Sequence, residues 1–190
     1  MENKNNSLFR QTNAFAMLYG LWLGLWGFLS LVLMVAAMAH PFLSFVNVLT
    51  FYGSPFFAAY LTVRFRRNVM VPETGFTFGR GFLFTFMMGI YASIWIAVGV
   101  YAYLAWFDHG YVFDVYEQVL SQPENAAQLT QSGMLDALTQ GKGISGVVDA
   151  MRAVSPGNYA GMVIYLTFFS APFFSALIAL ACRRAPKIFS

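Results

Sequence analysis

The stretch FYGSPFFAAYLTVRFRR at residues 51–67 decides the fold, because a similar stretch, FFSAPFFSALIALACRR, recurs at residues 168–184. With an offset of 117 residues, seven of the seventeen positions are identical, among them Pro55 with Pro172. Each stretch is strongly apolar and ends on a pair of arginines. An apolar segment that ends on basic residues is typical of a helix that crosses a membrane and stops at its surface. The repeat predicts an all-α membrane protein whose two halves resemble each other.

The composition of the whole chain indicates the same class. Hydrophobic residues make up 58% of the 190 residues and charged residues only 10%, and the mean hydropathy is +0.60. A soluble domain carries about 25% charged residues. The net charge of +3 does not indicate a nucleic-acid partner, because the basic residues flank apolar segments. The one cysteine, Cys182, excludes an intramolecular disulfide and a cysteine zinc cluster.

Four segments are apolar and long enough to cross a bilayer. No Asp, Glu, Lys or Arg occurs between Arg10 and Arg64, and this interval is broken only at His40-Pro41. In lipid each backbone N–H and C=O must bond within its own segment, so all four should be helices of about 20 residues or more. The predicted spans are residues 13–39, 42–63, 81–107 and 158–182. We expect one membrane domain over residues 1–190, a bundle of two helical hairpins, with a small helical insert at 108–157.

The distribution of charge predicts the orientation. The two tails and the 64–80 loop carry nine basic and two acidic residues, whereas the 108–157 insert carries six acidic and two basic residues. Basic residues beside spans remain in the cytoplasm. We therefore expect a multi-pass protein of the inner membrane with both termini cytoplasmic and the insert extracytoplasmic. A competing interpretation, cleavage of a signal peptide at Ala37-Met38-Ala39, is disfavoured because the apolar run exceeds the 7–15 residues of a signal peptide.

The repeat itself leaves alternatives open. Two similar hairpins that run in the same direction would be related by an axis along the membrane normal, as in some transporters. The likeness is also explained in part by composition, since the chain has 21 phenylalanines. Pro55 and Pro172 lack an N–H, so each frees the carbonyl four residues earlier in its helix. Each proline is a candidate ligand or partner contact, and the simpler interpretation is a fixed kink that aids packing.

Small residues four apart favour close helix approach, within the bundle or between protomers. They occur at Gly20 and Gly24 and at Ala171, Ser175 and Ala179. Asn47 is the most polar side chain of the second span. It is a candidate ligand contact, and an interhelical hydrogen bond is the favoured interpretation.

The insert has helical periodicity in three stretches, which predicts two or three short amphipathic helices. Pro123 is expected to start the middle one. Because the insert is acidic, it should pack on protein rather than on anionic lipid. Whether it caps the bundle, lies on the membrane or binds a partner stays open. The apolar stripes are Val112, Val115, Tyr116, Val119 and Leu120; Leu135 and Leu138; and Ile144, Val147, Val148, Met151 and Val154.

Polar candidates gather at the two boundaries of the membrane. His40, Asp108 and His109 fall at the outer boundary and could form a metal or proton site if the first and third spans are neighbours. Their spacing is not diagnostic, so solvated side chains are the favoured interpretation, and we predict neither a metal nor a cofactor. At the inner boundary, arginines either bind lipid headgroups or serve only as orientation signals. These are Arg66, Arg67, Arg80, Arg183 and Arg184.

The third span begins with Gly75-Phe76-Thr77-Phe78-Gly79-Arg80-Gly81-Phe82, a Gly-x-x-Phe-Gly-x-Gly-Phe pattern. With four spans and a polar helical insert before the last one, the chain resembles the bacterial membrane-protein family known as domain of unknown function 4199. The resemblance covers nearly the whole chain and implies a bacterial inner membrane. It implies no activity, because the family has none assigned.

The sequence contains no P-loop, HExxH or GxSxG motif, so we expect no enzymatic activity. The favoured function is a scaffold or interaction protein that acts in the lipid bilayer through helix packing and its outer helical cap. Its partner would be a second copy of the chain or another membrane protein. The alternative is a small-molecule or lipid transporter or channel built from the two similar hairpins.

Overall fold

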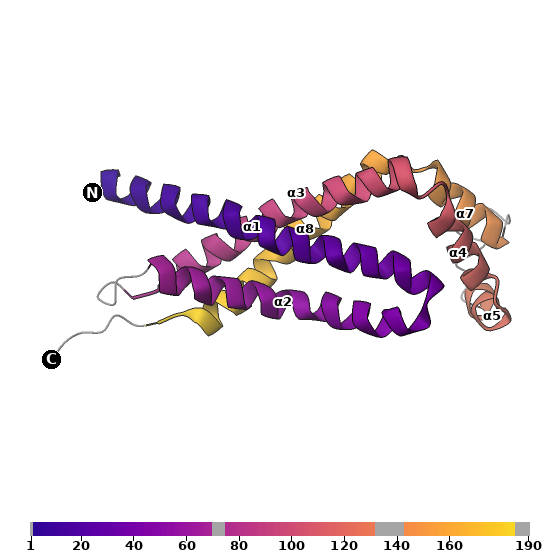
Figure 1. Cartoon of the computed structure of the whole chain (residues 1–190), viewed down its shortest axis with the longest axis horizontal. Coiled ribbons are helices and arrows are strands. Elements are labelled where there is room, and N and C mark those ends of the chain that lie inside the picture. The colour runs from indigo at the N-terminus through magenta and orange to yellow at the C-terminus, as the bar shows by residue number, and fades with distance from the viewer. Residues whose placement is uncertain (1, 70–74, 132–142, 185–190) are drawn as a thin grey trace. The chain divides into compact units, whose positions relative to one another are not determined.

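The structure of the chain, a computed structural model, describes residues 2–69, 75–131 and 143–184. This part of the chain is built from helices (Figure 1) and divides into two compact units. The membrane unit consists of Met1–Gly99 and Gly161–Ser190, and the insert unit consists of Val100–Ala160. Helices α3 and α8 contribute residues to both units.

Four helices are long and apolar enough to cross a membrane, which confirms the predicted class. They are α1 (Glu2–Ala39), α2 (Pro41–Val69), α3 (Phe78–Ala102) and α8 (Pro156–Cys182). A π-helical turn, η1 (Tyr103–Phe107), continues α3. When η1 is counted with α3, all four helices extend beyond the predicted spans, most clearly at the start of α1 and the end of α2. Hydropathy marks only the apolar part of a helix, and a helix can continue past it into polar residues.

The first two helices form the predicted hairpin around His40-Pro41. His40 is the only residue between α1 and α2. Its N–H donates to the carbonyl of Ala36, and its own carbonyl accepts from the N–H of Leu43. Pro41 takes the first position of α2, where a missing N–H costs nothing.

The described residues of the insert unit, 100–131 and 143–160, include three short helices: α4 (Tyr111–Leu120), α5 (Pro123–Gln131) and α7 (Gly143–Ala153). The start of α5 at Pro123 confirms that prediction. The apolar stripe of α7 packs as expected, and its Val148 is only 1% exposed. The predicted stretch at Leu135 and Leu138 lies outside the described residues.

The apolar stripe of α4 is packed along only part of its length. Val112, Val115 and Leu120 are half-buried, whereas Tyr116 and Val119 are 42% and 44% exposed. Packing instead includes Phe113, whose ring centroid lies 6.0 Å from that of Tyr159. Phe113 is adjacent to the predicted stripe and was not among the residues expected to pack.

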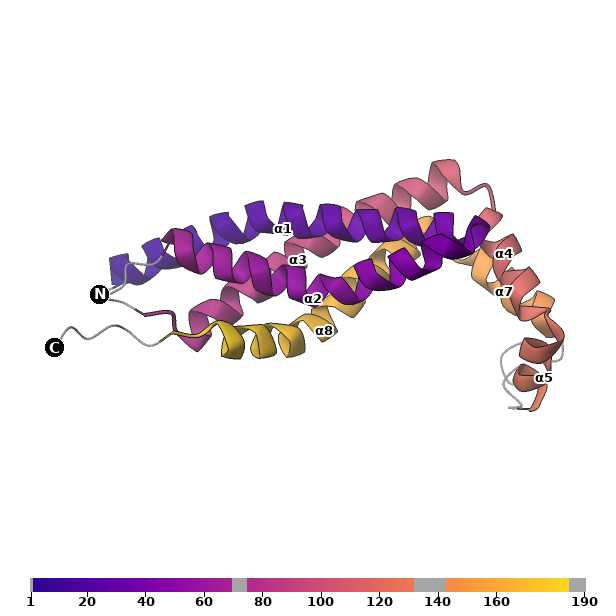
Figure 2. The same cartoon turned by 60° about the horizontal axis from the view of Figure 1, so that its bottom comes forward.

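Contacts fix the directions of the helices within the membrane unit (Figures 1 and 2). Helix α1 runs antiparallel to α2, since Trp26 contacts Thr50 and Tyr19 contacts Asn68. Helix α3 likewise runs antiparallel to α8, because Gly81 lies next to Ala179 and Gly89 lies next to Ala171.

The predicted small-residue positions lie at close contacts between helices. In α1, Gly20 and Gly24 lie against α3, where an added Cβ would come within 2.5 Å of the Tyr91 Cβ and 2.8 Å of the Trp95 Cβ. In α8, Ala171, Ser175 and Ala179 are buried. Apolar packing between helices gains little in lipid, so close backbone approach of this kind supplies the contact.

The starts of α1 and α3 and the ends of α2 and α8 lie at the same end of the membrane unit (Figures 1 and 2), and these segments carry seven arginines. We call this the basic end. Its arginines are Arg10, Arg64, Arg66, Arg67, Arg80, Arg183 and Arg184. Two backbone hydrogen bonds between Phe76 and Arg184 tie the segment before α3 to the segment after α8.

A cluster of aromatic rings fills the interior near the basic end. Phe65 of α2 stacks on Phe84 of α3 with centroids 4.0 Å apart, and both side chains are fully buried. Phe15 and Tyr19 of α1 approach this pair at 5.6 Å and 5.9 Å, and Phe76 completes the cluster at 6.1 Å. The aromatic cluster therefore joins three helices and the segment before α3.

Candidate functional site

Helices α2 and α8 repeat each other in structure as well as in sequence. The positions buried in the second half of α2 are buried at the same offset of 117 residues in α8. The four equivalent pairs are Ala58 with Ser175, Leu61 with Ile178, Thr62 with Ala179 and Phe65 with Cys182. The shared spacing presents one face of each helix to the interior, so the two stretches have the same role in packing.

The repeat extends N-terminally to a threonine before each proline. In α2 the hydroxyl of Thr50 donates to the carbonyl of Val46 at 2.8 Å. In α8 the equivalent Thr167 donates to the equivalent Val163 carbonyl, also at 2.8 Å. Serine hydroxyls of α2 and α8 also donate to the carbonyls of these threonines, at 3.2 Å and 3.5 Å. Hydrogen bonds from a hydroxyl to a carbonyl of the same helix bend the helix. Near a proline they also give partners to backbone groups that lack one.

The two prolines differ in their surroundings. Pro55 is half-buried and Pro172 is exposed. Beside Pro55, the Nε1–H of Trp26 donates to the carbonyl of Thr50 at 3.0 Å, and the indole stacks on Phe57 at 4.8 Å. The part of α2 around Pro55 is thus fixed to α1 by a tryptophan. In α8, close packing of Ala171 on Gly89 takes the place of such a contact.

Asn47 makes an interhelical hydrogen bond. The hydroxyl of Ser30 in α1 donates to its Oδ1 at 3.3 Å. This geometry agrees with the favoured interpretation of Asn47 as a packing residue. The bond links α1 to α2 one turn before the Trp26–Thr50 contact.

A second interhelical polar contact joins Thr62 of α2 to Thr85 of α3. Their hydroxyl oxygens lie 3.0 Å apart, fully buried between α2 and α3. Each hydroxyl also lies within hydrogen-bond distance of a carbonyl in its own helix, Ala58 for Thr62 and Gly81 for Thr85. The two hydroxyl protons are therefore shared among three oxygen–oxygen contacts. Small polar residues inside spans were the available signal for this pair.

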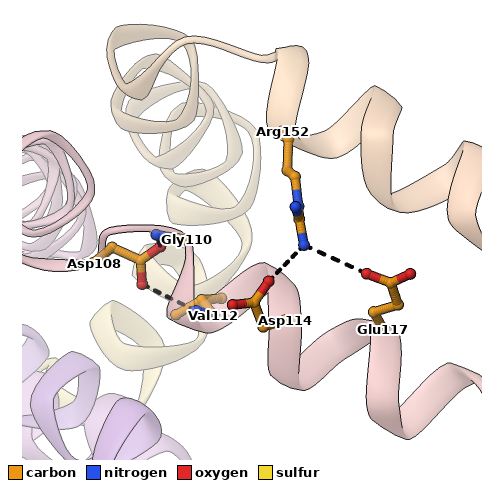
Figure 3. Close-up of polar contacts among 6 residues, drawn as sticks. All are labelled: Asp108, Gly110, Val112, Asp114, Glu117 and Arg152. Carbon is orange, nitrogen blue, oxygen red and sulfur yellow. Dashed lines mark hydrogen bonds and ion pairs between the residues drawn. The ribbon is translucent and has the colours of Figure 1, made fainter.

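Asp108 and His109 lie in the turn between η1 and α4, and Figure 3 shows the contacts of Asp108 there. The Asp108 carboxylate is only 4% exposed and accepts from the N–H groups of Gly110 and Val112, each at 3.1 Å. His109 is exposed and has a left-handed backbone, with φ of 46°. These contacts give Asp108 a local role, which is to satisfy the first N–H groups of α4.

His40 lies in the membrane unit and is exposed at the α1–α2 turn. Among the described residues, no group of three or more His, Cys, Asp or Glu side chains is placed to hold a metal ion. Asp108 directs both of its carboxylate oxygens to backbone N–H groups.

The five candidate arginines separate into two sets. Arg67, Arg183 and Arg184 have exposed side chains, whereas Arg66 and Arg80 are half-buried. Arg66 donates from Nη1 to the carbonyl of Cys182 at 2.7 Å, and Arg184 bonds to Phe76 through its backbone. Arg80 donates from Nη2 to the Oε1 of Gln11 at 3.1 Å and lies over the ring of Phe65.

The four apolar helices and their small-residue contacts define the class: a multi-pass helical membrane protein. A family model described as Protein of unknown function (DUF4199) matches residues 15–184. The chain therefore belongs to this family, as its sequence pattern predicted. The comparisons with curated proteins and with solved structures gave no significant match.

Proposed function

We propose that the protein is a non-enzymatic scaffold or interaction protein of the bacterial inner membrane. It acts through contacts between its helices and through its insert unit, which serves as an outer cap. Its partner is a second copy of the chain or another membrane protein.

The packing of the aromatic cluster carries this proposal. A carrier or channel needs an open path between its helices, and ligand sites in transporters lie near the middle of the bilayer. Here Phe65 and Phe84 stack at 4.0 Å and fill the interior near the basic end, where an open path would have to emerge. The buried polar side chains of α2 and α3 are hydroxyls that bond to their own helices or to each other. Both features favour a packed structural element.

The proposed orientation rests on charge. The basic end would face the cytoplasm, where positively charged segments remain, and both termini would lie there. The insert unit would then be extracytoplasmic. Reactivity of single cysteines introduced at Arg67 and at Glu124, toward a reagent that does not cross membranes, tests this in whole cells. If the reagent labelled the cysteine at position 67 and not the cysteine at position 124, the proposed orientation would be refuted.

The exposed side of α4 is the proposed contact surface. Its exposed apolar side chains are Tyr111, Tyr116 and Val119, which are 39%, 42% and 44% exposed. They lie on a helix that otherwise packs on α7 through charged and apolar contacts. A surface of this kind outside the apolar spans supports contact with a partner protein.

Photo-crosslinking in cells tests the proposal. A photoreactive residue at Tyr116 or Val119 should give a discrete crosslinked product, identified by mass spectrometry as a second copy or a partner. The matched control is Ala150, an exposed position on α7. Crosslinking to lipid alone from Tyr116, Val119 and Ala150 would refute the proposal.

The repeat of α2 and α8 favours a second candidate, a small-molecule or lipid transporter or channel. Equivalent prolines with equivalent threonine bonds would let two hairpins move alike around the axis between them. Purified protein in liposomes would then support flux, and Pro55→Ala together with Pro172→Ala would reduce it. Liposomes with no flux above protein-free controls would exclude this candidate.

A further inference from the structure

Arg80 holds an unusual position at the basic end. It is the third residue of α3, at the start of an apolar span. Its Nη2 donates to Gln11 of α1 at 3.1 Å, and its guanidinium carbon lies 5.7 Å from the ring centroid of Phe65 of α2. Three helices therefore hold one guanidinium in place. An arginine that served only as an orientation signal would need none of these contacts.

This guanidinium has no carboxylate partner in the described part of the chain. Both ion pairs found there are made by Arg152 of the insert unit. The described side chains of the membrane unit include the seven arginines of the basic end and no Asp or Glu. None of those described side chains supplies a counter-anion for the basic end.

The hydrogen bonds of Arg80 are also incomplete. Its Nε is shielded from water, and it is the one buried side-chain nitrogen or oxygen among the described residues without a partner. An unpaired buried donor has a free-energy cost, which is larger when the donor is charged. An acceptor that reaches the Nε edge of the guanidinium would remove this cost.

We propose that Arg80 anchors a phosphate-binding site at the basic end of the membrane unit. A guanidinium presents parallel N–H groups that match two phosphate oxygens, and the pair is stronger than a neutral hydrogen bond. Arg80 is only half-buried as a whole, so a change in its side-chain torsions turns the Nε edge toward an approaching phosphate. Gln11 and Phe65 limit how far the guanidinium can move.

The phosphate has two sources, an anionic phospholipid or the free ion. The start of an apolar span lies at headgroup depth, which brings lipid phosphates close to this residue. Phe78 and Phe82, one turn apart on α3 on either side of Arg80 in the sequence, stack at 6.0 Å. A basic site between helices at the inner face is one that phospholipid headgroups fit.

The test measures thermal unfolding of the full chain in a phosphate-free detergent. Three additives are compared: phosphatidylglycerol, diacylglycerol with the same acyl chains, and inorganic phosphate. For the unmodified chain we expect phosphatidylglycerol to raise the unfolding temperature and diacylglycerol not to raise it. Arg80→Gln should weaken the apparent affinity for the phosphate ligand about tenfold. Arg67→Gln, which changes an exposed arginine at the same end, should leave the affinity unchanged.

Gln11→Glu provides a second variant that keeps Arg80. The new carboxylate would pair with the guanidinium and compete with phosphate, so this variant should be more stable without lipid and respond less to it. If only phosphatidylglycerol raises the unfolding temperature, and only when Arg80 is present, the ligand is the lipid. If inorganic phosphate also raises it in an Arg80-dependent way, the free ion is a ligand. Equal responses of the unmodified chain, Arg80→Gln and Gln11→Glu, or an equal effect of diacylglycerol, would overturn the proposal.

Discussion

Arg66 in the last turn of α2 donates a hydrogen bond from its Nη1 to the backbone carbonyl of Cys182, the last residue of α8, at 2.7 Å. The last carbonyls of a helix have no partner within the helix. An arginine from the first repeated stretch therefore caps the helix formed by the second. Arg183, the equivalent residue of the second stretch, is exposed. The capping is therefore not reciprocal: α2 caps α8 through Arg66, and Arg183 does not do the same for α2.

We predict that Arg66→Met destabilises the membrane unit, because it keeps the length of the side chain and removes the donor. A hydrogen bond to a charged group contributes about 1.5–3 kcal/mol, and the free energy of unfolding in detergent should fall by about this amount. The control is Arg67→Met, since Arg67 is exposed one residue further along. Equal losses from both variants would contradict the capping role.

The buried hydroxyl pair of Thr62 and Thr85 gives a second prediction. Thr62→Val or Thr85→Val removes one hydroxyl from the 3.0 Å contact, and the two changes together should cost less than the sum of the separate costs. Interhelical hydrogen bonds in membranes average about 0.6 kcal/mol, which sets the expected coupling in a double-mutant cycle of unfolding. Thr167→Val is the matched control, since Thr167 bonds within its own helix. Additive effects at Thr62 and Thr85 would mean that the hydroxyls do not interact.

Much of the fold could be predicted from the sequence, because lipid imposes simple rules on it. The four spans, the His40-Pro41 turn and the small residues at helix contacts all follow from backbone hydrogen bonding and close packing. The start of α5 at Pro123 follows from the fixed φ of proline. These features depend on local sequence, which is why they could be identified without a structure.

Contacts between distant segments could not be predicted in the same way. Nothing local in the sequence pairs Phe76 with Arg184 or aims Arg80 at Gln11. Asp108 was a candidate for a metal or proton site, and its carboxylate binds the backbone of α4. In the sequence, an aspartate shortly before a glycine is compatible with a metal or proton site and with a cap on the next helix. Only the geometry of the turn distinguishes these two roles.

The glycines of α1 give a prediction about helix packing. Gly20→Ala would bring a Cβ within 2.5 Å of the Tyr91 Cβ and 3.0 Å of the Met88 carbonyl oxygen. Neither atom can move without shifting α3. At Gly27 the added Cβ would meet the flexible end of Ile96, which can change rotamer. Gly20→Ala should therefore lower the unfolding temperature in detergent clearly more than Gly27→Ala.

A third glycine controls this comparison. Gly161 in α8 has open space around the position of a Cβ, so Gly161→Ala should leave stability nearly unchanged. If Gly20→Ala and Gly161→Ala had the same effect, α1 would not pack on α3 through Gly20.

In the insert unit, exposed ion pairs and buried apolar packing between α4 and α7 should contribute differently to stability. Arg152 of α7 lies between Asp114 and Glu117 of α4, at 2.5 Å and 3.4 Å (Figure 3). All three side chains are substantially exposed, at 42%, 59% and 42%, and exposed ion pairs contribute about 0–1 kcal/mol. Arg152→Gln should therefore change the stability of the insert unit little, and added salt should reduce even that change.

Val148→Ala should have the larger effect on the same unit. Val148 is 1% exposed on the packed stripe of α7, and each buried methylene removed costs about 0.8 kcal/mol before the cavity is counted. We expect a loss of about 2 kcal/mol, seen as faster amide hydrogen exchange in both α4 and α7, while exchange in α1 and α2 stays the same. If Arg152→Gln accelerated exchange as much as Val148→Ala, the ion pairs would hold α4 on α7 and apolar packing would not.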